Sequence, residues 1–131
     1  MLKILIVEDD STCSELLART LSAYGNCDIA ADGQVALLMY NKAKEENQPY
    51  QFICLDVLLP HVDGREVLRR IREAEAKEGI PAKDAVKIII TTSVDAPGEV
   101  MSAFQLGCEG YVVKPVKKEA LLRELKKLSL I

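Results

Sequence analysis

The sequence predicts an α/β fold in which a parallel β-sheet is covered by helices on both faces. Five short aliphatic runs alternate with five longer segments that have helical periodicity. The connections between consecutive runs are far longer than a hairpin turn, so that each has room for a helical crossover. Strands joined by right-handed crossovers lie parallel, and helices then bury both sides of their sheet.

The composition is typical of one globular domain, expected to span residues 1–131. Apolar residues make up 49% and charged residues 28%, and the net charge of -3 gives no general attraction to nucleic acid or anionic membranes. No apolar run approaches the roughly 20 residues of a membrane span, and the N-terminal run is too short for a signal peptide. We therefore expect a cytoplasmic protein with no membrane insertion and no direct nucleic-acid binding.

The four cysteines show no spacing that is typical of a zinc site or a redox pair. The single histidine, His61, is interpreted as a loop residue. We expect reduced, mostly buried thiols at Cys13, Cys27, Cys54 and Cys108.

The first half of the chain contains three predicted strands and two helices. Acidic residues and a serine after the first strand are suited to begin a helix, and Gly25-Asn26 is suited to end it. Asp32-Gly33 begins the second helix. The predicted strands are Leu2–Val7, Cys27–Ala30 and Tyr50–Asp56. The first helix is predicted at Ser11–Tyr24, with Leu17, Leu21 and Tyr24 on one face. The second begins at Gly33, has Val35, Leu38 and Met39 as its apolar face, and frays at Asn41–Asn47.

The second half follows the same alternation. Asp63-Gly64 begins a third helix with an apolar stripe, and the charge run Arg69–Glu78 is interpreted as a solvated face with ion pairs four residues apart. The other predicted elements are strands at Val86–Thr91 and Tyr111–Val113, helices from Pro97 to about Gly107 and from Lys118 to Leu128, a linker at Ile80–Asp84 and a loop at Thr92–Pro97. This order predicts a doubly wound, flavodoxin-like (βα)5 sheet with strand order 2-1-3-4-5.

Charged side chains follow several of these strands, and the carboxyl ends of parallel strands meet at one edge of a sheet. Glu8 and Asp9 follow the first strand and Asp56 ends the third, which is its neighbour in this order. Three crowded carboxylates repel one another unless a cation joins them, and oxygen ligands of this kind suit Mg²⁺. Lys114 adds one fixed positive charge, and Thr92 adds a hydroxyl donor.

This set of residues resembles the response-regulator receiver domain, and the resemblance spans nearly the whole chain. It is carried by Glu8-Asp9, Asp56 to Pro60 with Gly64, Thr92-Ser93, Gly107, Gly110-Tyr111 and Lys114-Pro115. The resemblance implies that Asp56 is the phosphoacceptor, and that Glu8, Asp9, Asp56 and the backbone carbonyl of Leu58 hold Mg²⁺. It further implies that Thr92, Ser93 and Lys114 contact the phosphoryl group, that Tyr111 is an aromatic switch residue, and that the Lys114-Pro115 peptide is cis.

The same resemblance implies a two-component phosphorelay function. Asp56 would accept a phosphoryl group from a phosphohistidine of a sensor histidine kinase or a histidine phosphotransferase, in a Mg²⁺-dependent reaction. The expected protein catalyses only its own phosphorylation and dephosphorylation, and is a monomer or weak dimer. Attraction of Thr92 to the aspartyl phosphate would let Tyr111 turn inward and so change the binding of a downstream protein target by the fourth helix, fifth strand and fifth helix.

Three other functions fit the sequence less well. A phosphorylation-independent binding module is disfavoured by the complete set of acids and Lys114. A haloacid-dehalogenase-like phosphatase usually has a second Asp two residues after its nucleophile, where this chain has Leu58. A flavin or nucleotide binder needs a phosphate-binding loop after the first strand, where Glu8-Asp9-Asp10 would repel phosphate.

Two residues near the expected site have apolar side chains. Leu58 and Val94 lie two residues after Asp56 and Thr92, where the family places side chains that flank the attacking water. Because apolar side chains give no help in orienting water, we expect a long-lived aspartyl phosphate. The connection from the third helix to the fourth strand is longer than in compact family members, and the sequence offers no functional reason for it.

Overall fold

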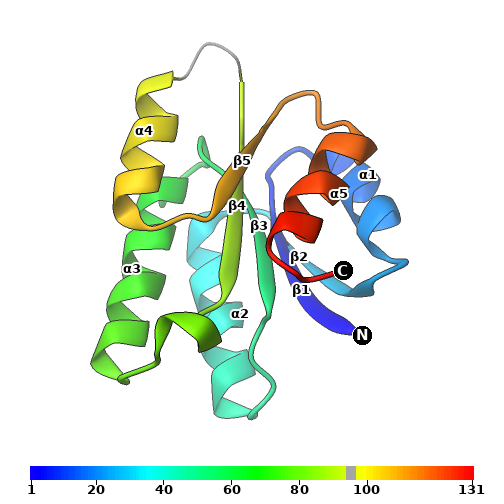
Figure 1. Cartoon of the computed structure of the whole chain (residues 1–131). Helices are drawn as coiled ribbons and strands as arrows, with labels where there is room; N and C mark the ends of the chain where they lie inside the picture. Colours follow the sequence, from blue (N-terminus) through cyan, green and yellow to red (C-terminus); the bar gives the residue numbers. More distant parts are fainter. Residues whose placement is uncertain (94–96) are drawn as a thin grey trace.

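The computed structural model describes residues 1–93 and 97–131, and the predicted fold class and strand order are confirmed. One parallel sheet has the order β2-β1-β3-β4-β5, with α1 and α5 on one face and α2, α3 and α4 on the other (Figure 1). The strands are β1 (Leu2–Val7), β2 (Gly25–Ala30), β3 (Phe52–Asp56), β4 (Lys87–Thr92) and β5 (Gly110–Val113). The helices are α1 (Ser11–Leu21), α2 (Gly33–Glu45), α3 (Gly64–Lys77), a 3-10 turn (Ala82–Asp84), α4 (Pro97–Leu106) and α5 (Lys118–Lys127).

The sheet separates two apolar cores, because alternate side chains of a strand point to opposite faces. Leu5, Ile53 and Ile90 pack on the α2–α3–α4 side. Ile4 and Phe52 pack on the α1–α5 side, together with Leu121 and Leu125 of α5. The central strands β1 and β3 are therefore covered on both sides, and their carboxyl ends are rigid points from which side chains can project.

The first helix ends three residues earlier than predicted, because Gly25 starts the next strand. Gly25 pairs with Leu2 of β1, and a Cβ atom on it would lie 2.4 Å from the Leu2 carbonyl oxygen. The glycine therefore allows close strand pairing here and does not act as a helix stop. The predicted bounds of β1 are confirmed, as are the carboxyl ends of β2, β3 and β5. The remaining strand ends differ from the predicted ones by one or two residues.

The predicted apolar face of α2 is wrong at Val35 and Leu38, whereas its third residue, Met39, packs against the core. Leu38 is 64% exposed and Val35 is 40% exposed, whereas Ala36, Tyr40 and Ala43 are buried. Small alanine side chains let the helix lie close to its neighbours while the Tyr40 ring fills the remaining space. The helix also continues to Glu45 instead of fraying from Asn41.

The interpretation of Arg69–Glu78 as a solvated face is only partly correct. Exposed ion pairs do join Arg69 to Glu73 and Arg70 to Glu66. Glu75, however, is 5% exposed, and its carboxylate accepts a hydrogen bond of 2.8 Å from the Val86 amide. This part of α3 therefore faces the interior and holds the start of β4.

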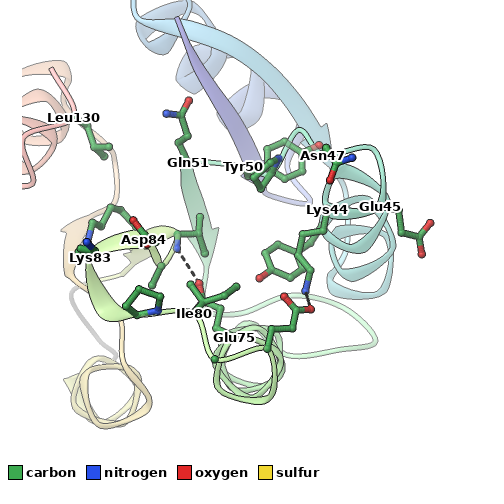
Figure 2. Close-up of a pocket in the computed structure, with 18 residues that line it drawn as sticks. Lys44, Glu45, Asn47, Tyr50, Gln51, Glu75, Ile80, Lys83, Asp84 and Leu130 are labelled. Carbon is green, nitrogen blue, oxygen red and sulfur yellow. Dashed lines mark hydrogen bonds and ion pairs between the residues drawn. The ribbon is translucent and has the colours of Figure 1, made fainter.

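A groove of about 930 Å³ lies at the amino-terminal ends of β3 and β4, away from the carboxyl ends (Figure 2). Lys44, Tyr50, Glu75 and Ile80 line it, and Lys44 forms an ion pair with Glu78. No helix in the described ranges 1–93 and 97–131 has both the length and the apolar character to cross a bilayer.

Candidate metal and phosphoryl site

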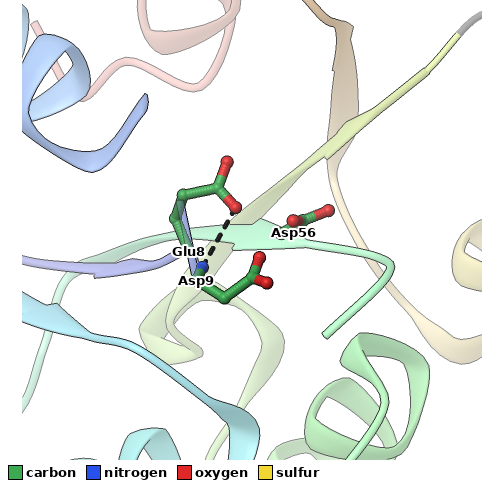
Figure 3. Close-up of side chains that lie close together, drawn as sticks. All are labelled: Glu8, Asp9 and Asp56. Carbon is green, nitrogen blue, oxygen red and sulfur yellow. Dashed lines mark hydrogen bonds between the residues drawn. The ribbon is translucent and has the colours of Figure 1, made fainter. Parts of the chain in front are cut away.

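Three carboxylates meet at the carboxyl ends of β1 and β3. The register pairs Val7 with Leu55, which brings the next residues of each strand, Glu8 and Asp56, side by side. One carboxylate oxygen from each of Glu8, Asp9 and Asp56 lies within 4.8 Å of the others (Figure 3). Parallel pairing thus gathers acids that are 48 residues apart in the chain.

The acids differ in their exposure to solvent. Glu8 is 2% exposed and Asp56 is 5% exposed, whereas Asp9 is exposed. Buried carboxylates need compensation, and Lys114 supplies it from the end of β5. Its ammonium group lies 2.6 Å from Glu8 Oε1 and 3.0 Å from Asp56 Oδ2.

Burial and the neighbouring Asp56 carboxyl raise the pKa of Glu8 to about 7, against the lowering effect of Lys114. Burial alone would lower the pKa of Lys114, but its hydrogen bonds to Glu8 and Asp56 outweigh this and raise the pKa above its ordinary value. The lysine therefore stays charged. The two carboxyl groups compete for one cation, so the site still favours added positive charge.

The two oxygens of Asp56 are held from different sides. The backbone N–H of Leu58 donates to Oδ1 at 3.1 Å, and Lys114 donates to Oδ2. These two contacts fix the plane of the carboxylate. The donor role of the Leu58 amide was missed from the sequence, because every residue type except proline carries the same backbone N–H and no side-chain pattern marks it.

Thr92 and Ser93 lie at the end of β4, next to the end of β3. Thr92 is buried, and its hydroxyl donates to the Ser93 carbonyl oxygen at 3.3 Å. Neither side chain contacts Asp56 through a hydrogen bond among the described residues. Their proposed contact with a phosphoryl group therefore stays a prediction.

Tyr111 lies on the edge strand with its side chain turned outward. It is 44% exposed, and its ring packs edge-on against Phe104 with a centroid distance of 6.0 Å. The Leu58 side chain is also exposed, and the Lys114-Pro115 peptide bond is cis. Val94, the other apolar residue expected near the site, lies outside the described residues.

The residues present fit a magnesium ion. Glu8, Asp9 and Asp56 provide hard oxygen ligands from two strand ends, and the exposed Asp9 keeps the cluster open to water. No cysteine or histidine joins this cluster in the part of the chain that the structure describes, which disfavours zinc. The rival phosphatase reading still lacks its second acid, because Leu58 presents an exposed apolar side chain.

A family model described as "Response regulator receiver domain" matches residues 4–126. "Response regulator MprA" of Mycobacterium sp. (strain KMS) is 34% identical over 96% of this chain, and "Hybrid signal transduction histidine kinase L" of Dictyostelium discoideum is 31% identical over 95%. The chain spans 50% of the first relative and 7% of the second.

Solved structures give the same assignment. Vibrio cholerae chemotaxis protein CheY4 has a TM-score of 0.80 and 27% identity over 98% of both chains. A second solved structure is the complex of the Saccharomyces cerevisiae histidine phosphotransfer protein Ypd1 with the receiver domain of its downstream response regulator Ssk1. The match has a TM-score of 0.82 and 26% identity, and it covers 97% of this chain and 88% of that chain.

Proposed function

This chain belongs to the response regulator receiver domain family of two-component signalling, and on that premise we propose that Asp56 accepts a phosphoryl group from a phosphohistidine. The donor is a sensor histidine kinase or a histidine phosphotransferase, as the Ypd1–Ssk1 complex suggests by analogy. The observation that carries the proposal is the convergence of Glu8, Asp9, Asp56 and Lys114 in one pocket.

In this reaction an Asp56 oxygen forms a bond to phosphorus as the bond from phosphorus to the donor imidazole nitrogen breaks. The Leu58 amide and Lys114 hold the carboxylate in a fixed plane, which lowers the cost of orienting the nucleophile. Lys114 also places positive charge where the phosphoryl oxygens arrive. Magnesium held by Glu8, Asp9, Asp56 and the Leu58 carbonyl would supply further positive charge against the repulsion of two anions.

The aspartyl phosphate adds roughly 1.5 to 2 negative charges at the end of β3. Thr92 lies at the end of the neighbouring strand, and its weak bond to Ser93 is easily exchanged for one to the phosphoryl group. Movement of Thr92 would open space for Tyr111, which now packs outside against Phe104. The result is a changed surface on α4, β5 and α5 for a downstream protein target.

The test is phosphorylation by a small acyl phosphate. The protein is incubated with acetyl phosphate with and without Mg²⁺, and its intact mass is measured. We expect one added phosphoryl group only with Mg²⁺, none in Asp56→Asn, and normal labelling in Asp10→Asn, whose exposed acid lies outside the cluster. Labelling that persists in Asp56→Asn, or no labelling of the native chain, would contradict the proposal.

A further inference from the structure

The strand β5 forms one edge of the sheet, and its outer side has no strand partner among the described residues. In a parallel ladder, successive residues direct their backbone groups to alternate sides. The Lys114 amide donates to the Thr92 carbonyl at 2.6 Å, so Lys114 faces β4. Val113 and Tyr111 consequently present their backbone N–H and C=O groups to the free edge.

A groove of about 490 Å³ runs beside this edge, between β5 and α5. The β5 side contributes residues 111–115. On the α5 side, Ala120 leaves room between the helix and the strand, since its side chain is only a methyl group. The remaining lining residues of α5 and its N-terminal turn are Lys117, Arg123, Glu124 and Lys127.

The α5 wall of the groove is positively charged. Lys117 and Arg123 are exposed and form no ion pair within residues 1–93 and 97–131. The one acid of the wall, Glu124, lies 3.0 Å from Lys127 and is already compensated. A ligand that carries carboxylates toward α5 would therefore gain two cations without displacing an existing ion pair.

The opposite side of the edge is apolar and aromatic. Tyr111 and Phe104 are 44% and 43% exposed, and their rings form a joint surface next to the strand. Val112, the residue after Tyr111 in β5, points instead to the α5 side of the sheet and is buried with Leu121 and Leu125. The two sides of the free edge therefore differ in chemistry, one basic and one aromatic.

We propose that the free edge of β5 binds an extended segment of a partner protein, in which acidic and apolar residues alternate, as an added strand. Successive side chains of such a strand point to opposite faces of the sheet. One set of side chains would meet Lys117 and Arg123, and the other would meet the rings of Tyr111 and Phe104. Pairing with a second copy of this chain is disfavoured, because it would bring the basic walls of the two copies together.

This edge is also connected to the acidic site. Lys114 lines the groove while its ammonium group bonds Glu8 and Asp56, and Tyr111 lines the groove as well. If Asp56 is phosphorylated, rearrangement of these two residues would change the affinity for the added strand. This regulation rests on the proposed function, whereas the binding itself does not.

The probe is a fluorescein-labelled eight-residue peptide of alternating Val and Glu, with a Val and Lys peptide as control. We expect saturable anisotropy with the acidic peptide only, and slower amide hydrogen exchange at Tyr111 and Val113 in the complex. N-methylation of one alternate set of peptide nitrogens should abolish binding, and methylation of the other set should not. No saturable binding, or equal tolerance of both methylated peptides, would overturn the proposal.

Charge reversal on α5 gives a matched comparison. Arg123→Glu should weaken binding by roughly tenfold or more, while Lys126→Glu, the same charge change on an exposed residue outside the groove, should have much less effect. Equal losses would indicate only a general charge effect and would refute the groove. Mass measurement of phosphorylated Asp56 in the same samples separates the two proposals, since labelling without peptide binding removes this inference and leaves the proposed function standing.

Discussion

At the scale of single residues, Gly64 is the position where space is most restricted beside the site. Its amide donates to the Val57 carbonyl, and a Cβ atom on it would lie 2.1 Å from the Asp56 carbonyl oxygen and 2.9 Å from Val57 Cα. All of these neighbours are backbone atoms, which cannot turn away as a side chain can. The first turn of α3 is thus packed directly against the strand end that carries Asp56.

We predict that Gly64→Ala lowers the free energy of unfolding by about 2 kcal/mol or more and slows labelling of Asp56 by acetyl phosphate. Gly98→Ala is the control, because an added Cβ atom there meets nothing within 4 Å. Urea denaturation and mass-resolved labelling rates check both variants. Equal stability of the two proteins would show that the backbone around Asp56 adjusts more easily than its packing indicates.

We expect the side chain of Leu58 to influence how water approaches Asp56. Its side chain is 58% exposed and offers no polar atom near the Asp56 carboxylate that its own amide contacts. We predict that Leu58→Asn shortens the lifetime of the aspartyl phosphate several-fold, since an amide can orient water. Leu38→Asn, at an exposed leucine on α2, is the control. A half-life of seconds in the unchanged protein would contradict the expectation of a long-lived phosphate.

The residues of the site were predictable because each stands at the end of an aliphatic run. Once Glu8 and Asp56 are assigned to neighbouring parallel strands, their proximity follows from topology alone. The hydrogen bonds that orient Asp56 are harder to predict from the sequence. The contact of Lys114 with Glu8 depends on how far a flexible side chain reaches, and the Leu58 amide has no signature in the sequence.

At the scale of elements, the sequence predicts the positions of strands more accurately than the buried faces of helices. A strand buried on both sides needs only a run of aliphatic residues, as in Ile4–Val7. A helix face depends on what it packs against. In α2 the buried positions include Ala36, Tyr40 and Ala43. The hydrophobic Leu38 predicts a different buried face, but its side chain is exposed.

Arg72 of α3 shows a second limit of the sequence pattern, because the charge run includes a partly buried network of hydrogen bonds and ion pairs. Its guanidinium donates to the carbonyls of Gly107 and Val86 at 3.0 and 2.9 Å, and to the carboxylates of Glu75 and Glu109. Glu109 in turn accepts from the Ile88 amide at 2.6 Å. One side chain thus joins α3, the start of β4 and the turn between α4 and β5.

We predict that Arg72→Ala lowers the free energy of unfolding by about 3 to 5 kcal/mol, because it leaves Glu75 buried without its partner. Arg70→Ala removes an exposed pair with Glu66 on the same helix and should cost about 1 kcal/mol or less. Urea denaturation of both variants checks the difference. Similar losses would mean that the network adds nothing beyond helix propensity.

At the scale of the whole molecule, the sheet connects the acidic site to the α4–β5–α5 surface. Asp56 and Thr91 are register partners on β3 and β4, and Thr92 pairs with Val113 on β5. Thr92, Lys114 and Tyr111 therefore lie within two neighbouring strands. If Asp56 is phosphorylated as proposed, we expect the added charge to move side chains at these strand ends while the buried strands keep their positions.

Metal binding should be visible in the stability of the entire fold. Glu8, Asp9 and Asp56 repel one another in the native chain, and unfolding separates them, so a cation that joins them stabilises the native state alone. We predict that Mg²⁺ at about one hundred times its dissociation constant raises the free energy of unfolding by about 2.7 kcal/mol. Thermal or urea unfolding with and without the ion measures this gain.

Two single substitutions show whether the gain comes from this cluster. Asp9 is exposed, so Asp9→Asn should leave the fold intact, relieve some repulsion in metal-free buffer and remove most of the response to Mg²⁺. Asp10 caps α1 by accepting from the amides of Thr12 and Cys13. Asn caps a helix as well as Asp does, so Asp10→Asn should keep the response. Equal responses in the two variants would place the ion elsewhere and would separate Mg²⁺ binding from the carboxylates beside Asp56.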